Sequence, residues 1–352
     1  MPPKVAPFAF DAPAIAQEFM RPSALQALRV PHRIGEPLTV RRVVVVRKAS
    51  AIDLLESRPD AKLQHALGVR DPLAERVLQA HLENQASAEA VEAELRGRQL
   101  SFKVVPKLTP PLARWADLVV SVGGDGTFLR ASHAVRPWGE GVGAPMLGVN
   151  SASSSAGFFC SACSRDFGEQ LDLIASGAMV SRALWRMEIL VNGVPLDHHA
   201  LNDILFAHRV PAETSRYVIT VDGVSQEQKS SGIWISTAAG STGAMRSAGG
   251  VVQPMDSREL QFLVREPMDW ALKGTPLVHG CTLGEVNTVS RMVQGALYID
   301  GGNLRVAFGF GDRLTFRTAD KPLAWFAPPE LDARRRALTT PPNLRASQSA
   351  NS

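Results

Sequence analysis

This 352-residue chain has few cysteines, little excess of either charge and no long apolar run. Its three cysteines, Cys160, Cys163 and Cys281, are too few for a disulfide framework, which favours a reducing, cytoplasmic location. Cys160 and Cys163 have the spacing of a zinc-binding pair, but no second pair follows, so we interpret them as structural thiols. No stretch approaches the ~20 apolar residues that cross a bilayer, which argues against a membrane partner.

Lys and Arg number 38 against 34 Asp and Glu, and the formal net charge is only +4. No basic run with interleaved aromatic residues appears, so the sequence does not indicate a nucleic-acid partner. The G-x-x-x-x-G-K-[S/T] motif of P-loop enzymes is absent. A G-x-G-x-x-G motif after the first predicted strand is also absent, which argues against a hydride-transferring dehydrogenase.

The first half of the chain has the pattern of an α/β domain. Four consecutive valines within residues 40–48 indicate a buried strand of a parallel sheet. Asp71-Pro72 predicts the start of a helix that runs to about Gly97, and residues 118–123 predict another strand. This alternation predicts a Rossmann-like domain with a mostly parallel sheet over residues 38–180.

From residue 181 the pattern changes to short strands separated by turns such as Asn192-Gly193. It predicts an all-β, sandwich-like domain over residues 181–318. The proline-rich residues 1–37 are expected to form a flexible arm, and the polar residues 331–352 a disordered tail.

The stretch LVVSVGGDGTFL, residues 118–129, predicts a strand that ends in a glycine turn before a helix. Glycines let a ligand approach the backbone, and amides at a helix N-terminus bind phosphate. Asp125 needs a separate explanation, because its negative charge would repel phosphate. It suits a general base that takes a proton from an alcohol, a step worth ~10²–10⁴ in rate. The alternative is that Asp125 caps the following helix.

A second constellation covers residues 230–250, where 16 of 21 residues are Gly, Ala, Ser or Thr. Its hydroxyls and amides are expected to line a polar ligand, with close packing between domains as the alternative. Lys229, just before it, offers a cation for a phosphate. The side chains of Asn202 and Asp203 can hydrogen-bond to a base edge and to a ribose. Such a pair is also common in turns, where Asn and Asp bond to their own backbone.

Taken in order, these stretches resemble the NAD kinase family, which transfers the γ-phosphoryl group of ATP to the 2′-hydroxyl of the adenosine ribose of NAD⁺ or NADH. The resemblance covers roughly residues 40–325. The matching blocks are Gly123–Thr127, Leu147–Asn150, Gly157–Phe159, Ala200–Asp203, Ser236–Gly250 and Ile299–Gly301. The family fold, shared with diacylglycerol kinases, is an α/β domain and a β-rich domain, with a last segment, here residues 319–330, that returns to the first domain.

The resemblance implies that Asp125 is the base that activates the ribose hydroxyl, and that Mg²⁺ accompanies ATP. It implies that Phe158 packs by the adenine, and that Asn202 and Asp203 contact the adenosine half of the dinucleotide. Further residues expected to hold the nucleotides are Gly124, Gly126, Thr127, Asn150, Thr242, Gly243, Ala244 and Ser247. The partners implied are ATP and NAD(H), with a second copy of the chain in a homodimer or homotetramer.

Three positions depart from the family pattern: Ser231, Ala244 and Gly302 stand where many members have Asp, Tyr and Gln. Only the oxidised nicotinamide ring is cationic, so an anion near the ligand would favour NAD⁺. Because that anion is missing here, NADH and NAD⁺ are both possible substrates. Residues 228–232 and the first strand look more like the NADH-preferring and mitochondrial branches. A lipid or sugar kinase on a related fold, and a non-catalytic NAD(H) sensor, remain alternatives. ATP and polyphosphate both remain open as donors.

Overall fold

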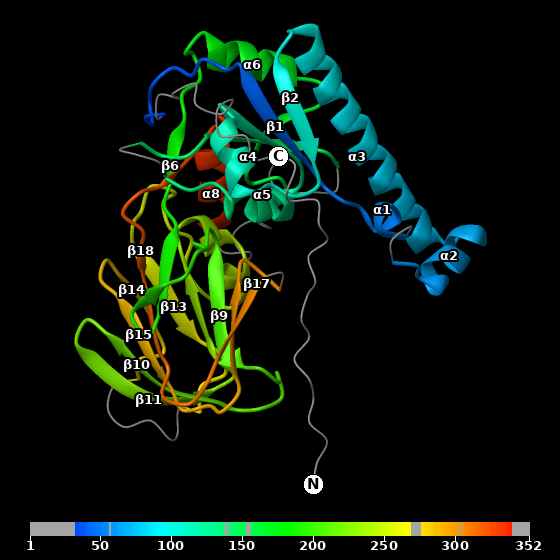
Figure 1. Ribbon diagram of the computed structural model, residues 1–352. Helices are drawn as coiled ribbons and strands as arrows, with labels where there is room; N and C mark the ends of the chain where they lie inside the picture. Colours follow the sequence, from blue (N-terminus) through cyan, green and yellow to red (C-terminus); the bar gives the residue numbers. More distant parts are fainter. Residues whose placement is uncertain are drawn as a thin grey trace, which may run out of the picture. The chain divides into compact units, whose positions relative to one another are not determined.

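The structure is a computed structural model that describes residues 32–55, 58–137, 141–152, 156–268, 276–302 and 304–339. Most of the arm expected over residues 1–37, and residues 340–352 of the expected tail, lie outside the described residues. Within the described part, one sheet belongs to an α/β domain and two belong to a β-rich domain (Figure 1). This confirms the predicted fold class.

The sheet of the α/β domain has the strand order β2-β1-β3-β4-β19-β6, and β5 also pairs with β4. All its pairings are parallel except that of β19 with β6. Its strands are β1 (Arg42–Arg47), β2 (Ser101–Val105), β3 (Leu118–Gly123), β4 (Met146–Asn150), β5 (Cys160–Cys163), β6 (Arg182–Leu184) and β19 (Leu323–Trp325). Its helices are α1 (Ala51–Leu55), α2 (Ala61–Gly68), α3 (Pro72–Gly97), α4 (Pro110–Trp115), α5 (Asp125–Ser132) and α6 (Phe167–Ala175).

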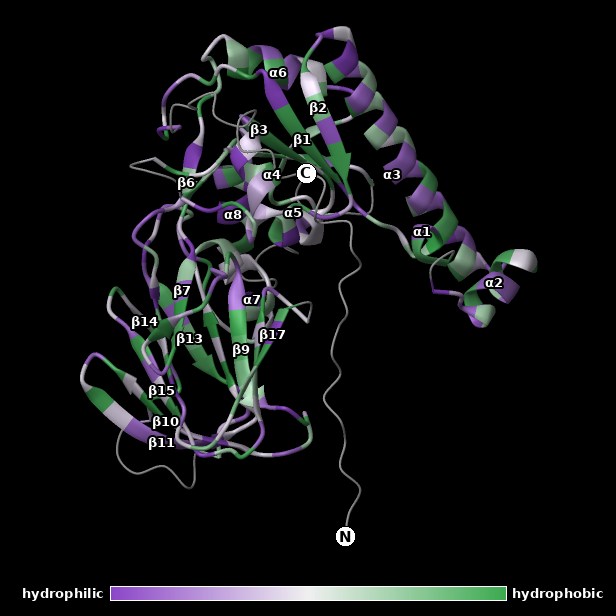
Figure 2. Ribbon diagram, viewed as in Figure 1, coloured by the Kyte–Doolittle hydropathy of each residue, from purple (hydrophilic) through white to green (hydrophobic). Residues whose placement is uncertain are grey.

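The four valines of β1 make this strand apolar between the arginines at its two ends (Figure 2). Successive side chains of a strand point to opposite faces of the sheet. Val43 and Val45 lie in one apolar cluster with residues of α3 and α6. Val44 and Val46 lie in another with residues of α4 and α5. Both faces of the sheet are therefore covered, as the sequence predicts for a parallel strand.

The β-rich domain is a sandwich of two antiparallel sheets. The first has the order β11 (Val224–Ser230), β10 (Ser215–Val221), β15 (Val286–Ser290), β18 (Arg313–Thr318), β7 (Met187–Val191) and β8 (Val194–Pro195). The second has the order β14 (His279–Thr282), β13 (Leu260–Val264), β12 (Ile233–Ser236), β9 (Asp203–His208), β16 (Gly295–Ile299) and β17 (Leu304–Phe308). Their facing side chains form one apolar cluster, in which Phe206 stacks on Phe308 and meets the edge of Tyr217 from the other sheet.

Two boundaries differ from the prediction. Residues 182–184, assigned by the sequence to the β-rich domain, form β6 in the first sheet, where they pair with β19. Residues 331–339, expected to be part of a disordered tail, form helix α8 (Leu331–Thr339). Leu331 and Arg335 on this helix are buried. The helix is held by partners of its side chains in distant loops, and the sequence does not show which loops these are.

Candidate active site

The glycine turn lies at the carboxyl end of β3. Gly124 is the N-cap of α5, and Asp125 is the first residue of this helix. The Thr127 amide donates to the Gly124 carbonyl over 2.9 Å, and a Cβ on Gly123 would lie 2.3 Å from the Thr127 hydroxyl oxygen. Gly126 is exposed, with open space where a side chain would be. The turn thus presents backbone amides at a helix N-terminus, an arrangement that suits phosphate.

Asp125 makes its hydrogen bond outside its own helix. Its Oδ1 accepts the N–H of Phe159 over 2.9 Å, and no side chain caps α5. The interpretation of Asp125 as a helix cap is therefore wrong. Among the described residues, Oδ2 of Asp125 has no hydrogen-bond partner, and the side chain is half-buried. One oxygen of the carboxylate is thus held, and the other is available to a ligand.

The segment from Gly157 to Phe159 lies against the glycine turn. Asn150, the last residue of β4, is the register partner of Gly123. A Cβ on Gly157 would lie 2.9 Å from the Asn150 side-chain nitrogen, and Gly157 has a φ of 59°. Phe159 is buried and stacks on Phe128 of α5 at 4.9 Å between ring centroids. The predicted Asn150 and the Gly157–Phe159 block therefore meet the predicted turn at one edge of the sheet.

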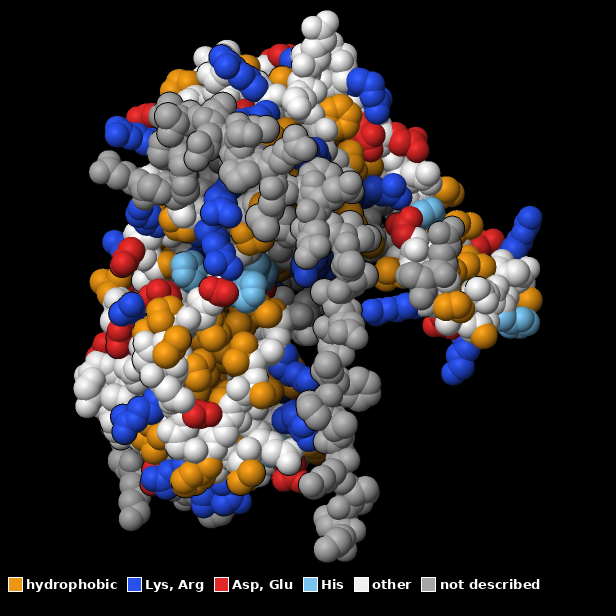
Figure 3. Space-filling model, in the orientation of Figure 1, with side chains coloured by type: hydrophobic (Ala, Val, Ile, Leu, Met, Phe, Trp, Pro, Cys, Tyr) orange, Lys and Arg blue, Asp and Glu red, His pale blue; other side chains and the backbone are white. Residues whose placement is uncertain are grey.

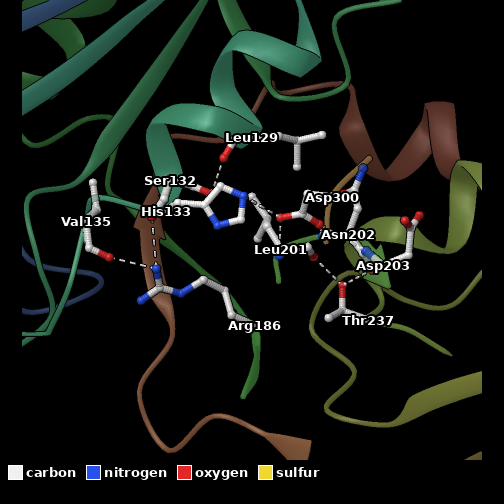
Figure 4. A network of polar contacts seen from close by, with 10 residues as sticks. All are labelled: Leu129, Ser132, His133, Val135, Arg186, Leu201, Asn202, Asp203, Thr237 and Asp300. Atoms are coloured by element: carbon white, nitrogen blue, oxygen red, sulfur yellow. Dashed lines mark hydrogen bonds and ion pairs between the residues drawn. The ribbon is translucent and has the colours of Figure 1, made fainter. Parts of the chain in front are cut away.

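Asp300 organises the second half of the site (Figure 4). Its carboxylate accepts the backbone N–H groups of Leu201 (2.8 Å), Asn202 (2.7 Å) and Asp203 (3.2 Å). Its own N–H donates to the Asp203 carbonyl over 2.9 Å. Two blocks that lie far apart in the sequence are thus fixed to each other by one side chain.

The small-residue turn packs on the same loop. The Thr237 amide donates to the Asn202 carbonyl over 2.9 Å, and the Thr237 hydroxyl donates to the Leu201 carbonyl over 2.5 Å. A Cβ on Gly240 would lie 2.2 Å from the Asn202 carbonyl oxygen, so only glycine fits there. The turn contains the 3₁₀ helix η2 (Ala239–Thr242), followed by helix α7 (Ala244–Ser247). The residue pattern therefore serves close packing, and its role as a binding wall stays a prediction.

The two aspartates of this half have unusual proton affinities. Burial, and next the negative charge of Asp300, raise the pKa of Asp203 to about 7. Burial also raises the pKa of Asp300, to about 6, against the opposite effect of its three backbone donors and of Arg186. Near neutral pH the Asp203 carboxyl group is therefore only partly ionised. A group in that state can both donate and accept a hydrogen bond toward a ligand.

His133 and Arg186 join the two halves. His133, the C-cap of α5, places Nε2 3.3 Å from Oδ2 of Asp300. Burial, aided by nearby cationic groups, lowers the pKa of His133 to about 4, so at neutral pH this contact involves an uncharged ring. Arg186 is buried and donates to the carbonyls of Ser132 (3.2 Å) and Val135 (2.7 Å), just beyond α5 (Figure 4).

Most of the residues predicted for the site come together in these two halves. Asn202 is half-buried, and its buried Oδ1 has no hydrogen-bond partner among the described residues. Gly243 lies near Asp203, since a Cβ on it would be 4.0 Å from the Asp203 Oδ2. Thr242, Gly243, Ala244 and Ser247 follow on the η2–α7 turn, where Gly243 and Ser247 are exposed.

Lys229 is the exception. It is exposed on β11, and the chain then runs along β12 before it reaches the site. Ser236, at the end of β12, pairs with Asp203, whereas Ile233 at its start pairs with Phe206 further from the site. Lys229 therefore lies beyond the remote end of β12, and the structure does not bring it to the other predicted residues of the same chain.

Two of the three positions that depart from the family pattern line one cavity. Ser231 and Gly302 both border a cavity of about 420 Å³ on the side of β9, β12 and β16 that faces away from the sandwich core. Apolar side chains gather over β9 and its neighbours in Figure 3. The cavity is lined by Leu205, Ala207, His208, Val210, Pro211, Glu213, Ser215, Ser231, Trp234, Arg265, Tyr298, Gly301 and Gly302. Ala244, the third position, lies apart from it at the start of α7.

Sequence reasoning missed Arg334 and Arg335 of α8. Arg334 contacts the Gly157–Phe158 segment, and Arg335 contacts the small-residue turn. One sign was present in the sequence. Leu331, Arg335 and Leu338 recur at helical spacing, and Asp332 precedes Arg336 in the order that suits a helix dipole.

The described residues contain no group of three His, Cys, Asp or Glu side chains that could hold a metal ion. His198 and His199 therefore form no such group in the part of the chain that the structure covers. The three cysteines are unpaired, with Cys160 buried and Cys281 exposed. None of the described helices is long and apolar enough to cross a membrane.

Comparison with known proteins gives a consistent result. Residues 44–179 match the family described as the ATP-NAD kinase N-terminal domain. A protein named Probable NADH kinase from Oryza sativa subsp. japonica is 37% identical over 238 residues, 61% of this chain and 71% of the relative. The NADH kinase of Arabidopsis thaliana is 34% identical over 237 residues, 60% of this chain and 72% of the relative. This chain belongs to the NAD kinase family.

Solved NAD kinase structures share the fold. The NAD kinase of Archaeoglobus fulgidus, crystallised in complex with ATP, has a TM-score of 0.62 and 20% identity, and the match covers 85% of this chain and 98% of that one. The yeast NADH kinase complexed with NADH has a TM-score of 0.61 and 16% identity, and that match covers 86% and 87%. Together with the sequence relatives, this confirms the family resemblance of the ordered motifs, and the blocks that carry it are those that build the two halves of the candidate site.

Proposed function

We propose that this chain transfers the γ-phosphoryl group of ATP to the 2′-hydroxyl of the adenosine ribose of NAD⁺ and NADH, giving NADP(H). ATP-dependent phosphorylation of NAD(H) follows from membership of the NAD kinase family. The observation that carries the finer proposal is the position of Asp125. Its carboxylate stands at a phosphate-binding turn, with Oδ1 held by Phe159 N–H and Oδ2 open among the described residues.

In the proposed mechanism Asp125 accepts the proton of the 2′-hydroxyl as the ribose oxygen attacks the γ-phosphorus. The bond between the γ-phosphorus and the β,γ-bridging oxygen of ATP breaks in the same step, and ADP leaves. The amides of Gly124 and Gly126 hold phosphate oxygens and stabilise their charge, while the Thr127 amide, which donates to the Gly124 carbonyl, fixes the shape of the turn. Phe158 packs by the adenine, while Asn202 and Asp203 hold the adenosine half of the dinucleotide. These roles are supported by the meeting of the two motif groups through the His133–Asp300 contact.

Magnesium is proposed to enter with ATP rather than to reside in the protein. Asp125 is the acidic residue of the glycine turn. One carboxylate is too few ligands to hold Mg²⁺ by itself, but it suits a cation that ATP phosphates also bind. When bound, Mg²⁺ would offset the negative charge of those phosphates.

We propose that NADH is accepted as well as NAD⁺. Ser231, in place of a carboxylate, lines the cavity that also contains Gly302. With serine at position 231, the acidic and basic residues of the lining are Glu213 and Arg265, one of each sign, so their charges do not favour the cationic oxidised ring over the uncharged reduced ring. Two relatives named NADH kinase support this proposal. A homo-oligomer and a cytoplasmic location remain predictions of the sequence.

The test is the Asp125→Asn variant, which keeps an acceptor for Phe159 N–H but cannot take up a proton. We expect kcat to fall by ~10²–10⁴ while the dissociation constant for NADH stays within about twofold. The assay combines NAD⁺ and NADH with ATP and polyphosphate as donors, and binding is followed by NADH fluorescence.

The matched control is Asp320→Asn, the same change at an exposed position. A variant that kept most of its turnover would refute the general-base role. Wild-type protein that binds NADH but phosphorylates neither dinucleotide would instead favour the sensor alternative.

A further inference from the structure

Helix α8 contacts the first half of the site through Arg334. The guanidinium group donates to the carbonyls of Gly157 (3.2 Å) and Ala156. Its Cζ also lies 4.8 Å from the centre of the Phe158 ring, within the range of a cation–π contact. Three successive residues beside the glycine turn are therefore fixed by one side chain.

The same helix is anchored to the second half by a different residue. Arg335 is buried and donates to the Ala238 carbonyl (2.7 Å), the Ser241 hydroxyl (2.9 Å) and the Gln253 carbonyl. Leu331 is wholly buried in the apolar cluster that also contains Phe128 and Trp325. Thus Arg335 and Leu331 hold α8 in place without Arg334. The contacts of Arg334 therefore serve to fix the segment of residues 156–158.

A short chain of contacts leads from Arg334 to Asp125. Arg334 holds residues 156–158, and the next residue, Phe159, donates its N–H to the Asp125 carboxylate over 2.9 Å. On the other side of this peptide the Phe159 carbonyl accepts Trp325 Nε1–H over 3.1 Å. The direction of the Phe159 amide is therefore set by residues 156–158 on one side and by the Trp325 contact on the other.

We propose that Arg334 is a positioning residue of the kinase reaction. It places the Phe158 ring for the nucleotide base and, through the Phe159 N–H, fixes the orientation of the Asp125 carboxylate. The inference rests on the proposed function for the roles of Phe158 and Asp125. Under this proposal helix α8 contributes a positioning residue to the active site.

The test uses the full chain with Arg334→Ala, and Arg336→Ala as the control. Arg336 is exposed two residues along the same helix, so the control has the same loss of charge and volume. For Arg334→Ala we expect KM for NADH to rise about tenfold and kcat to fall about tenfold. The melting temperature should stay close to that of the control, because Arg335 and Leu331 still anchor α8.

Arg334→Lys separates the two contacts of the guanidinium. Lysine keeps a positive charge for the Phe158 ring but cannot span two carbonyls as a planar guanidinium does. We expect KM to return most of the way to the wild-type value while kcat stays several-fold low. A residue that served only the fold would lower the melting temperature and leave KM and kcat per folded molecule unchanged, and that result would overturn the proposal.

Hydrogen exchange at the Phe159 amide gives a readout that does not depend on activity. We expect faster exchange in Arg334→Ala and wild-type exchange in Arg336→Ala. If the wild type phosphorylates neither dinucleotide, the proposed function fails, yet the exchange experiment still tests the positioning. Equal protection of Phe159 in both variants would overturn the inference even if the kinase activity is confirmed.

Discussion

At the scale of single residues, the burial of two carboxylates couples the stability of this protein to pH. Asp203 and Asp300 have pKa values raised to about 7 and about 6, whereas an unfolded chain releases such protons near pH 4. Between these limits the native state holds more protons than the unfolded state. The free energy of unfolding therefore falls as pH rises through this window. His133 and His199, with pKa values lowered to about 4, act in the opposite sense below pH 6.5.

The Asp203→Asn variant removes one of these titrations. Relative to wild type, we expect its unfolding free energy to fall less steeply between pH 4.5 and 7.5, and to be higher by roughly 1–2 kcal/mol at pH 8. Urea titrations across this range measure the difference, in which the histidine contributions cancel. Asp320→Asn should reproduce the wild-type slope. Parallel curves for wild type and Asp203→Asn would show that Asp203 is not protonated in the native state near neutral pH.

At the scale of elements, the sequence predicted what local patterns encode. The valines of β1 and the Asp71 cap of α3 are such cases: the Asp71 carboxylate accepts the N–H groups of Leu73 and Ala74, as a residue before a helix-initiating proline should. Helix α8 was missed because the partners of Arg334 and Arg335 lie in loops about 80 to 180 residues earlier in the chain.

For the candidate site, the ordered motifs indicated which residues to examine but not how they meet. Asp300 appeared in the sequence as part of an Asp-Gly turn, and nothing nearby indicated that its carboxylate would bind three amides of a loop a hundred residues away. His133 and Arg186 likewise acquire their roles only through tertiary contacts. Lys229 was the opposite case, a residue close to the motif in sequence but separated from it by a strand.

The turn that contains η2 depends on one close approach. In Gly240→Ala the new Cβ would overlap the Asn202 carbonyl, and backbone atoms cannot move aside cheaply. We expect a loss of about 1–3 kcal/mol in unfolding free energy, together with weaker NADH binding because Asn202 shifts. Gly97→Ala, at the end of α3 with nothing within 4 Å of the new atom, is the control and should cost nothing. Normal stability and binding in Gly240→Ala would contradict the close packing described for this turn.

At the scale of the whole molecule, one apolar cluster draws on both domains. Phe128 of the α/β domain, Leu201 and Ala239 of the β-rich domain, and Leu331 of α8 all belong to it. Trp325 of β19 is wholly buried in the same cluster and meets the rings of Phe128 and Phe159 edge-on. The two domains should therefore lose their structure together.

Trp325→Ala tests this cooperativity. We expect the free energy of unfolding to fall by about 3–5 kcal/mol, as for other large-to-small changes in a core. Far-ultraviolet circular dichroism and NADH binding, followed in the same urea titration, should change in one coincident transition. Val293→Ala, at an exposed position, should leave the midpoint unchanged. Two separated transitions would show that the domains unfold independently.

The position of β19 has a consequence for the order of events during synthesis. This strand occupies the place between β4 and β6, yet the ribosome makes it only after all the strands of the sandwich, β7 to β18. Until then β6 has no partner strand and β4 is unpaired at Met146, although β5 already pairs with the rest of that edge. Unpaired strand edges are surfaces to which other chains can pair and which chaperones cover. The sheet of the α/β domain therefore cannot be completed until residues 323–325 have been made. A ribosome stalled before them would carry every motif block of the candidate site while β6 still lacked its partner strand.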